Sequence, residues 1–360
     1  MMDLETPAIV VDLDVMERNL HRMAGYTREH GLRLRPHTKT HKIPEIARQQ
    51  LDLGAAGLTV AKVGEAEVML ESSPADLLVE YPIVGAAKLG RLAAVAGQAS
   101  VTVAVDSVAA ADQLSAAARA AGVQFGVLAE ADVGLGRVGV APADVPAFAR
   151  QLARMPNLVF HGISFFPGHI SGVKEDDGRA MDVLSSVIED MIAGLAKAGL
   201  TARVISGGNT PTAYHSHRLA GLNEIRPGTY VFNDRNTEVC GGCTIEDCAA
   251  SVLVTVVSTA VPGRAIIDGG SKTFSSDPYQ GPEPSFGHVM EAPEARFERM
   301  NEEHGFLAID RAGRRFTVGE RIRVIPNHVC PTVNLHDVVY GVRNDQVEQV
   351  WQVKGRGKLQ

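Results

Sequence analysis

Short apolar runs alternate with longer Ala- and Leu-rich stretches over the first two thirds of the chain. Eight runs are predicted as strands: Leu32–Lys39, Gly57–Val60, Asp76–Pro82, Ser100–Ser107, Gln124–Asp132, Leu158–Gly168, Arg203–Gly208 and Glu224–Asp234. The stretches between them have helical spacing and few β-branched residues, as in Pro44–Leu53, Lys62–Glu71, Val108–Ala121, Ala143–Met155 and Val183–Ala198. Strands that alternate with helices predict a parallel sheet, and eight repeats favour closure into a (β/α)8 TIM barrel.

From about Ile245 onward the pattern changes to short β-rich segments separated by turn residues. The predicted strands are Ala250–Val257, Arg264–Asp268, Phe306–Asp310, Arg321–Ile325, Val338–Arg343 and Gln346–Gln352. We expect them to form a C-terminal antiparallel β-domain, with which the early segment Ala8–Asp12 could pair. Residues 275–304, rich in Pro and polar groups, predict a long loop, and residues 14–30 a helix before the barrel. The expected domains are a barrel of residues 14–240 and a β-rich domain of residues 1–13 and 241–360.

Composition and charge narrow the class of protein. The chain is 45% hydrophobic and 21% charged, as is ordinary for a soluble globular enzyme. A net charge of -7 argues against nucleic acid as a general partner. No apolar run approaches a membrane span, and the acidic start lacks a signal-peptide pattern. Four cysteines do not make a disulfide scaffold, so a reducing cytoplasm is the expected location.

The segment Arg-Pro-His-Thr-Lys-Thr-His-Lys, residues 35–42, closes the first predicted strand and contains Lys39. A lysine held where it is desolvated has a lowered pKa and becomes a nucleophilic amine for Schiff-base chemistry. An isolated lysine would be interpreted as part of a solvated basic turn. The motifs that follow favour the chemical interpretation, because a barrel active site lies at the carboxyl ends of its strands, where Lys39 is expected.

Two glycine-bearing segments lie at the seventh and eighth strands. They are Ser-Gly-Gly-Asn-Thr, residues 206–210, and Arg-Pro-Gly-Thr-Tyr, residues 226–230. Glycines let backbone N–H groups approach a phosphate, and barrel phosphate sites commonly use these two loops. The plain alternative is a pair of tight turns. Arg137, in the glycine-rich bend of residues 130–139, could pair with a phenolate or carboxylate, or could simply be a surface arginine.

A candidate metal site lies in Asn-His-Val-Cys-Pro-Thr, residues 327–332. If this segment is a strand, His328 and Cys330 face the same side and aim an imidazole and a thiolate at one point. That pair favours zinc, in an open site completed by water, substrate or a third residue. Cys240 and Cys243, with Cys248, form a rival zinc or redox motif, but neither a second CxxC nor a nearby histidine completes four ligands.

Together these motifs resemble the D-threonine aldolase / D-serine dehydratase family of pyridoxal-phosphate enzymes, which share the fold type of alanine racemase. The resemblance covers nearly the whole chain. It rests on residues 6–13, 35–42, 130–140, 166–169 (Phe-Pro-Gly-His), 206–212, 226–230, 268–272 and 327–337. It implies pyridoxal phosphate and a divalent metal, zinc or manganese, as cofactors. It also implies a small D-3-hydroxy amino acid as substrate and a homodimer as the assembly.

The resemblance also implies roles for individual residues. Lys39 matches the lysine that carries the cofactor, Arg226 the arginine that faces the pyridine nitrogen, and Arg137 an arginine near the phenolic oxygen. His328 and Cys330 match the metal-ligand pair, and His169 is a candidate base. The phosphate-binding region, with neighbouring cofactor contacts, matches Ser206, Gly207, Gly208, Asn209, Thr210, Gly228, Thr229 and Tyr230.

The chain departs from the family pattern at two positions. Phe166 stands where members often have a tyrosine, which removes a hydroxyl from the site. Cys330 stands where the aldolase branch often has an aspartate, and this replacement favours the zinc-dependent dehydratase branch.

Three functions follow from these features. The first is D-threonine aldolase, which cleaves the substrate to glycine and an aldehyde. The second is a D-serine or 3-hydroxyaspartate dehydratase, which yields a 2-oxo acid and ammonia. The third is a non-catalytic pyridoxal-phosphate-binding protein, against which the second domain argues. We expect the aldolase.

Overall fold

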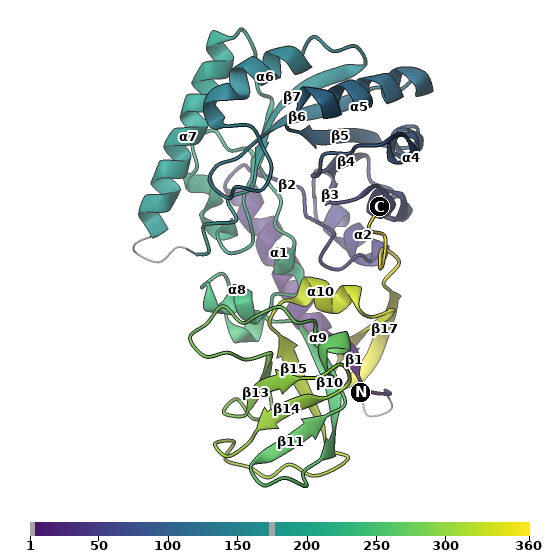
Figure 1. Ribbon diagram of the computed structural model, residues 1–360, viewed down its shortest axis with the longest axis vertical. Coiled ribbons are helices and arrows are strands. Elements are labelled where there is room, and N and C mark those ends of the chain that lie inside the picture. Colours follow the sequence, from purple (N-terminus) through teal and green to yellow (C-terminus); the bar gives the residue numbers. More distant parts are fainter. Residues whose placement is uncertain (1–3, 173–176) are drawn as a thin grey trace. The chain divides into compact units, whose positions relative to one another are not determined.

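The computed structural model describes residues 4–172 and 177–360. The chain folds into two compact units (Figure 1). The barrel unit contains Arg22–Lys39, Pro44–Gly228 and Gly357–Gln360, and the β-unit contains Met1–His21, Thr40–Ile43 and Thr229–Arg356. Among the described residues, no helix combines the length and apolar character needed to cross a membrane.

The barrel unit is built on eight parallel strands in the order β2-β9-β8-β7-β6-β5-β4-β3. They are β2 (Arg33–Leu34), β3 (Leu58–Val60), β4 (Asp76–Val79), β5 (Ser100–Val105), β6 (Phe125–Ala131), β7 (Leu158–Phe165), β8 (Val204–Gly207) and β9 (Glu224–Ile225). Beyond β2, His37 bridges Thr59 of β3, and the Thr59 amide donates to the Pro36 carbonyl at 2.9 Å. This bridge closes the ring, and the predicted (β/α)8 barrel is confirmed.

Two barrel strands are shorter than predicted. The segments Leu32–Lys39 and Glu224–Asp234 each contribute only two residues, β2 and β9. Pro36 and Pro227 follow these strands and lack the N–H group that a ladder needs. Lys39 therefore lies in a turn beyond β2 rather than on the strand itself.

Helices follow the strands in turn (Figure 1). The α-helices up to β8 are α1 (Leu13–Glu29), α2 (Pro44–Asp52), α3 (Val63–Met69), α4 (Ala86–Ala96), α5 (Val108–Ala121), α6 (Val145–Leu152) and α7 (Asp177–Lys197). Short 3-10 helices are η1 (Leu70–Ser72), η2 (Pro142–Asp144), η3 (Ala213–Arg218), η4 (Thr229–Val231) and η5 (Ile245–Asp247). Helix α4 was not among the predicted helices. Its Gly90 interrupts a helical pattern, and its N-cap, Gly85, has no side chain to signal a start.

The β-unit carries nine strands in the order β11-β14-β13-β12-β15-β10-β1-β16-β17. They are β1 (Ala8–Asp12), β10 (Ala250–Ser258), β11 (Arg264–Ile267), β12 (Gly287–Val289), β13 (Arg296–Met300), β14 (Gly305–Ala308), β15 (Arg321–Pro326), β16 (Val338–Arg343) and β17 (Gln346–Gln352). Strand β10 also pairs with β11, which closes part of this sheet into a small barrel. Strand β1 pairs with β10 and β16, as expected for the early segment. The helices here are α8 (Arg235–Val239), α9 (Ser271–Phe274) and α10 (Val329–Asn334).

The prediction of a long loop over residues 275–304 was wrong, because β12 and β13 lie within it. Strand β13 reads Arg-Phe-Glu-Arg-Met, and only Phe297 among these residues is buried. Strand β12 has only three residues, and β13 has one buried side chain among charged neighbours, so neither strand gives a detectable alternation.

Candidate active site

In the barrel unit, Lys39 and Arg137 approach the same aromatic ring. The Lys39 Nζ atom is 5.9 Å from the centroid of the Phe166 ring, and the Arg137 guanidinium carbon is 4.8 Å from it. Cations are attracted to the face of an aromatic ring at these separations. The structure thus brings together three residues that follow three different strands, β2, β6 and β7.

The loop that carries Arg137 is held by Asp132. The Asp132 carboxylate accepts the backbone N–H groups of Gly134 and Gly136, each at 3.0 Å, and these bonds lower the pKa of Asp132. A Cβ atom on Gly134 would lie 3.2 Å from the ring of His169. Gly134 therefore lets the imidazole of His169 pack against the Arg137 loop.

Arg226 is buried in a polar network beyond the carboxyl end of β9. Its guanidinium donates to the Ser206 hydroxyl at 2.6 Å, to Glu80 at 2.7 Å and to the Phe165 carbonyl at 3.0 Å. The Ser206 hydroxyl in turn donates to Glu224 at 2.8 Å. The network fixes Arg226 and fully engages the side chain of Ser206.

Glu130 extends this network. Its carboxyl group is buried, accepts a hydrogen bond from the Ser164 hydroxyl and lies beside Glu80. Burial, and then the charge of Glu80, raise the pKa of Glu130 well above its usual range. Sequence reasoning missed Glu80, Glu130 and Glu224. The available signal was a carboxylate in or directly after an apolar strand, as in Leu-Leu-Val-Glu80.

The segment after β8 offers backbone donors. Asn209 is buried, and its side chain donates to the carbonyls of Pro167 and Ile170, each at 3.0 Å. Gly208, with φ +90°, turns the chain at this point. Within residues 4–172 and 177–360, the backbone N–H groups of Asn209 and Thr210 donate to no protein acceptor. Buried amides in a glycine turn suit the phosphate of pyridoxal phosphate, so these residues fit the cofactor that the resemblance implies.

In the β-unit, His328 and Cys330 lie at the start of α10, and the prediction that they share a strand was wrong. Strand β15 ends at Pro326, His328 is the extended N-cap residue, and Cys330 is already in the helix. The two side chains nevertheless form a hydrogen bond with each other. Although burial opposes it, the hydrogen bond with Cys330 raises the pKa of His328 to about 10. The same bond lowers the pKa of Cys330 against the effect of burial.

Carboxylates and hydroxyls surround this pair. The Nδ1 atom of His328 is 2.6 Å from an Asp277 carboxylate oxygen. The Cys330 sulfur is 3.2 Å from the Thr40 hydroxyl and 3.8 Å from that of Thr229. A neighbouring imidazole and thiol are a donor set that a divalent metal can bind, with loss of the thiol proton. The residues therefore fit a metal, with Asp277 placed to orient the imidazole.

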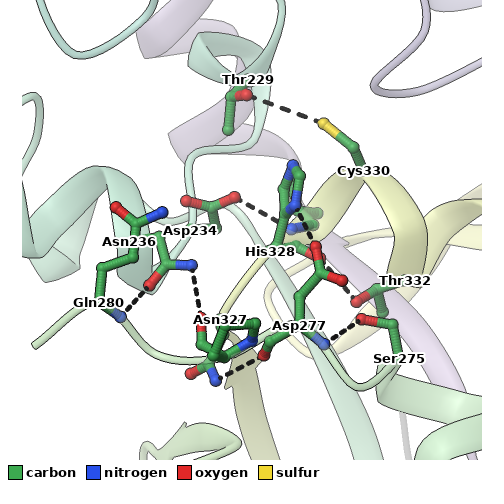
Figure 2. Close-up of polar contacts among 12 residues, drawn as sticks. Thr229, Asp234, Asn236, Ser275, Asp277, Gln280, Asn327, His328, Cys330 and Thr332 are labelled. Atoms are coloured by element: carbon green, nitrogen blue, oxygen red, sulfur yellow. Dashed lines mark hydrogen bonds and ion pairs between the residues drawn. The ribbon is translucent and has the colours of Figure 1, made fainter. Parts of the chain in front are cut away.

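The backbone around Asp277 is clamped in place. The Asn327 side chain donates to the Asp277 carbonyl at 3.2 Å and to the Ser285 carbonyl at 2.7 Å. The Asn236 side chain accepts the Gln280 amide at 3.0 Å. Figure 2 shows the bonds of Asn327, which lies between β15 and α10, and of Asn236 in α8 with the segment that contains Asp277 and Gln280. Asp277 had no signal in the sequence, because it lies in the stretch that was predicted to be a long loop.

Asp234 joins the starts of two helices. One of its carboxylate oxygens caps α8 by accepting the Thr237 amide at 2.8 Å, and the other accepts the Val329 amide at 3.0 Å. The second bond lies beside His328, so Asp234 fixes the backbone from which the imidazole projects.

The rival cysteine motif has a different character. Cys248 is buried, and its hydrogen bond with Cys243, followed by burial, raises the pKa of the Cys248 thiol. A neutral thiol is a poor metal ligand. Among the described residues, no group of three His, Cys, Asp or Glu side chains converges to hold a metal. A metal at His328 and Cys330 would thus have two protein ligands from the described chain.

Comparison with known protein families divides the chain into two successive domains. The alanine racemase N-terminal domain matches residues 11–236, and a serine dehydratase domain matches residues 249–342. A D-threonine aldolase from Arthrobacter sp. is 34% identical over 98% of this chain and 93% of its own.

Two solved structures have the same fold. D-threonine aldolase from Filomicrobium marinum is 33% identical, with a TM-score of 0.93 over 100% of this chain and 98% of that chain. A D-threo-3-hydroxyaspartate dehydratase mutant in a metal-free form is 33% identical, with a TM-score of 0.90 over 98% of each chain. The chain therefore belongs to the pyridoxal-phosphate family that joins an alanine racemase N-terminal domain to a serine dehydratase domain and includes both D-3-hydroxy amino acid aldolases and dehydratases.

Proposed function

We propose that this protein is a pyridoxal-phosphate- and metal-dependent aldolase that cleaves D-threonine and related D-3-hydroxy amino acids to glycine and an aldehyde. The observation that carries the proposal is the imidazole–thiol pair of His328 and Cys330, oriented by Asp277. A non-catalytic cofactor carrier has no use for such a pair. The family relationship supports the substrate class.

Residues of the barrel unit would hold the cofactor. Lys39 supplies the amine for it, and the backbone amides of Asn209 and Thr210, with Gly208, Gly228 and Thr229, supply donors for its phosphate. Arg226, whose cationic group is fixed by Glu80, is assigned to the ring nitrogen. Arg137 is assigned to the phenolic oxygen. When bound, the cofactor supplies an electron sink for the electron pair released at Cα.

The remaining groups act on the substrate hydroxyl. A divalent metal held by His328 and Cys330 would lower the pKa of that hydroxyl. His169 is assigned as the base that takes the hydroxyl proton, which leads to cleavage of the Cα–Cβ bond. Phe166 presents an apolar ring between Lys39 and Arg137, so it contributes packing and no proton.

One observation favours a dehydratase as the second candidate. Cys330 offers a thiolate where the aldolase branch often has an aspartate, and thiolate favours zinc. In this reaction Lys39 would remove the Cα proton and the metal would stabilise the departing hydroxide. The products would be a 2-oxo acid and ammonia.

Product analysis distinguishes the two reactions. The holoenzyme is incubated separately with D-threonine, D-allothreonine and L-threonine, and acetaldehyde is quantified against 2-oxobutyrate. We expect acetaldehyde and glycine in equal amounts from both D isomers and no product from L-threonine. Predominant 2-oxobutyrate would assign the chain to the dehydratases, and turnover of the L isomer would refute the stereochemical assignment.

A further inference from the structure

A cavity of about 220 Å³ lies in the barrel unit at the amino-terminal end of its strands. Four of its lining residues are the first residues of strands: Arg33 of β2, Asp76 of β4, Val204 of β8 and Glu224 of β9. The proposed cofactor residues follow the carboxyl ends of the same sheet, as in Gly208 and Arg226. The cavity is thus a feature separate from the proposed active site.

Positive charge exceeds negative charge in this cavity. Arg33, Arg35 and Arg203 line it, against Asp76 and Glu224. The buried Arg35 is neutralised, since its guanidinium lies 2.9 Å from Asp76 and 3.0 Å from Glu224. Arg33 is 3.6 Å from Glu224, which already serves Arg35. Arg203 has no ion-pair partner in the described part of the chain, which leaves one guanidinium without a counter-charge.

Thr102 and His161 add hydrogen-bonding groups to the wall. The Thr102 hydroxyl is 3.3 Å from the Nδ1 atom of His161. Burial, opposed by Asp76 and reinforced by the positive charges of Arg203, Arg35 and Arg33, lowers the pKa of His161. A Cβ atom on Gly126 would collide with the His161 ring. The absence of a side chain at Gly126 therefore leaves room for the His161 imidazole.

We propose that this cavity binds a small oxyanion, of the size and charge of inorganic phosphate. One anion would supply the counter-charge that Arg203 lacks and would accept hydrogen bonds from Arg33 and His161. Guanidinium groups bind such oxyanions through paired, charge-assisted hydrogen bonds. The inference does not depend on the reaction proposed above, because it uses none of the residues assigned to it.

Thermal unfolding of the holoenzyme tests the site. Inorganic phosphate is titrated against sodium chloride at constant ionic strength. A saturable rise in Tm is expected, since a ligand that binds only the folded state stabilises it. The cofactor occupies its own phosphate site throughout, so that site cannot give the signal.

Two variants localise the binding. Arg203→Gln and Arg33→Gln remove exposed guanidinium groups. Each should raise the apparent Kd for phosphate about tenfold or more. Arg48→Gln, exposed on α2, is the matched control and should bind like the wild type. The proposal is overturned if no saturable rise occurs in the wild type. It is also overturned if both cavity variants respond like Arg48→Gln, which would place the anion elsewhere.

Discussion

At the scale of single residues, Glu130 links protonation to stability. Its folded pKa lies well above the ordinary value of 4.5, so the folded protein keeps a proton that the unfolded chain loses. The stabilisation is complete below about pH 4.5 and is lost as the pH rises toward the folded pKa. Glu130→Gln mimics the protonated carboxyl group and does not titrate.

We expect the stability advantage of the wild type over Glu130→Gln to be larger at pH 5 than at pH 8. The slope is bounded by about 1.4 kcal/mol per pH unit. Urea unfolding at pH 5, 6, 7 and 8 measures it, with Glu189→Gln on the exposed face of α7 as control. A difference that stays constant over this range would show that Glu130 is ionised in the folded protein.

Asp277 controls the orientation of His328, and its loss should weaken metal binding. A carboxylate behind a ligating imidazole typically contributes about 10- to 100-fold to metal affinity. Asp277→Asn is therefore expected to raise the Kd for zinc by that factor, measured by competition with a chromogenic chelator. Asp112→Asn, exposed on α5, should leave the Kd unchanged. An unaltered Kd for Asp277→Asn would mean that the imidazole is held by other contacts.

The sequence predicted residues whose chemical type is distinctive and missed those that act through position. Lys39, Arg137, His328 and Cys330 are conspicuous because cations, imidazoles and thiols at strand ends need an explanation beyond folding. The carboxylates Glu80 and Asp277 are ordinary in composition. Only the fold shows that one contacts Arg226 and the other His328.

At the scale of elements, Gly162 in β7 tolerates no side chain. Its φ is +152°, and a Cβ atom there would overlap the Val204 carbonyl oxygen of β8. Gly162→Ala should lower the free energy of unfolding by at least about 2 kcal/mol. Gly90→Ala, at an exposed and open position in α4, should raise it by about 1 kcal/mol. Urea unfolding of both variants tests the contrast, and similar values for the two would refute it.

Element boundaries were predictable where local chemistry marked them. Helix α5 begins and ends as predicted, because Ser107 accepts the Ala110 amide at its start and Gly122 adopts φ 68° at its end. Helix α10 gave no such signal. Its N-cap residue, His328, makes no side-chain capping bond, and the amide of Val329 in the first turn is accepted by Asp234, which is distant in the sequence. Pro331 lies in that first turn, where a missing N–H group is tolerated.

At the scale of the whole molecule, removal of the metal should leave the fold intact. His328 and Cys330 lie at a helix start, and the core of the β-unit is apolar, with Val252, Val254, Ile322 and Val324 fully buried. Removal of the metal with a chelator should abolish turnover while the far-ultraviolet circular dichroism at 25 °C stays unchanged. His328→Ala and Cys330→Ala should behave alike and still bind pyridoxal phosphate. Loss of the dichroism signal on chelation would identify the metal as structural.

The fold class was predictable because eight repeats and a change of hydrophobic period are global patterns. Closure of the barrel was predicted from the number of repeats, but the contact that makes it, the bridge between His37 and Thr59, was not. The barrel and the antiparallel β-domain thus follow from the sequence pattern, whereas the contacts that complete each site depend on residues that are neighbours only in the folded chain.

The place of β1 limits how this protein can be divided. Strand β1 is hydrogen-bonded on one side to β10 and on the other to β16, although all eight barrel strands separate it from both in the chain. A gene exchange with a single breakpoint after the barrel would join strands of one parent to the β1 of another. Only an exchange with two breakpoints, one on each side of the barrel, keeps the three strands together. The barrel is therefore inherited as an insertion within the β-unit, and the two units cannot be shuffled as consecutive modules.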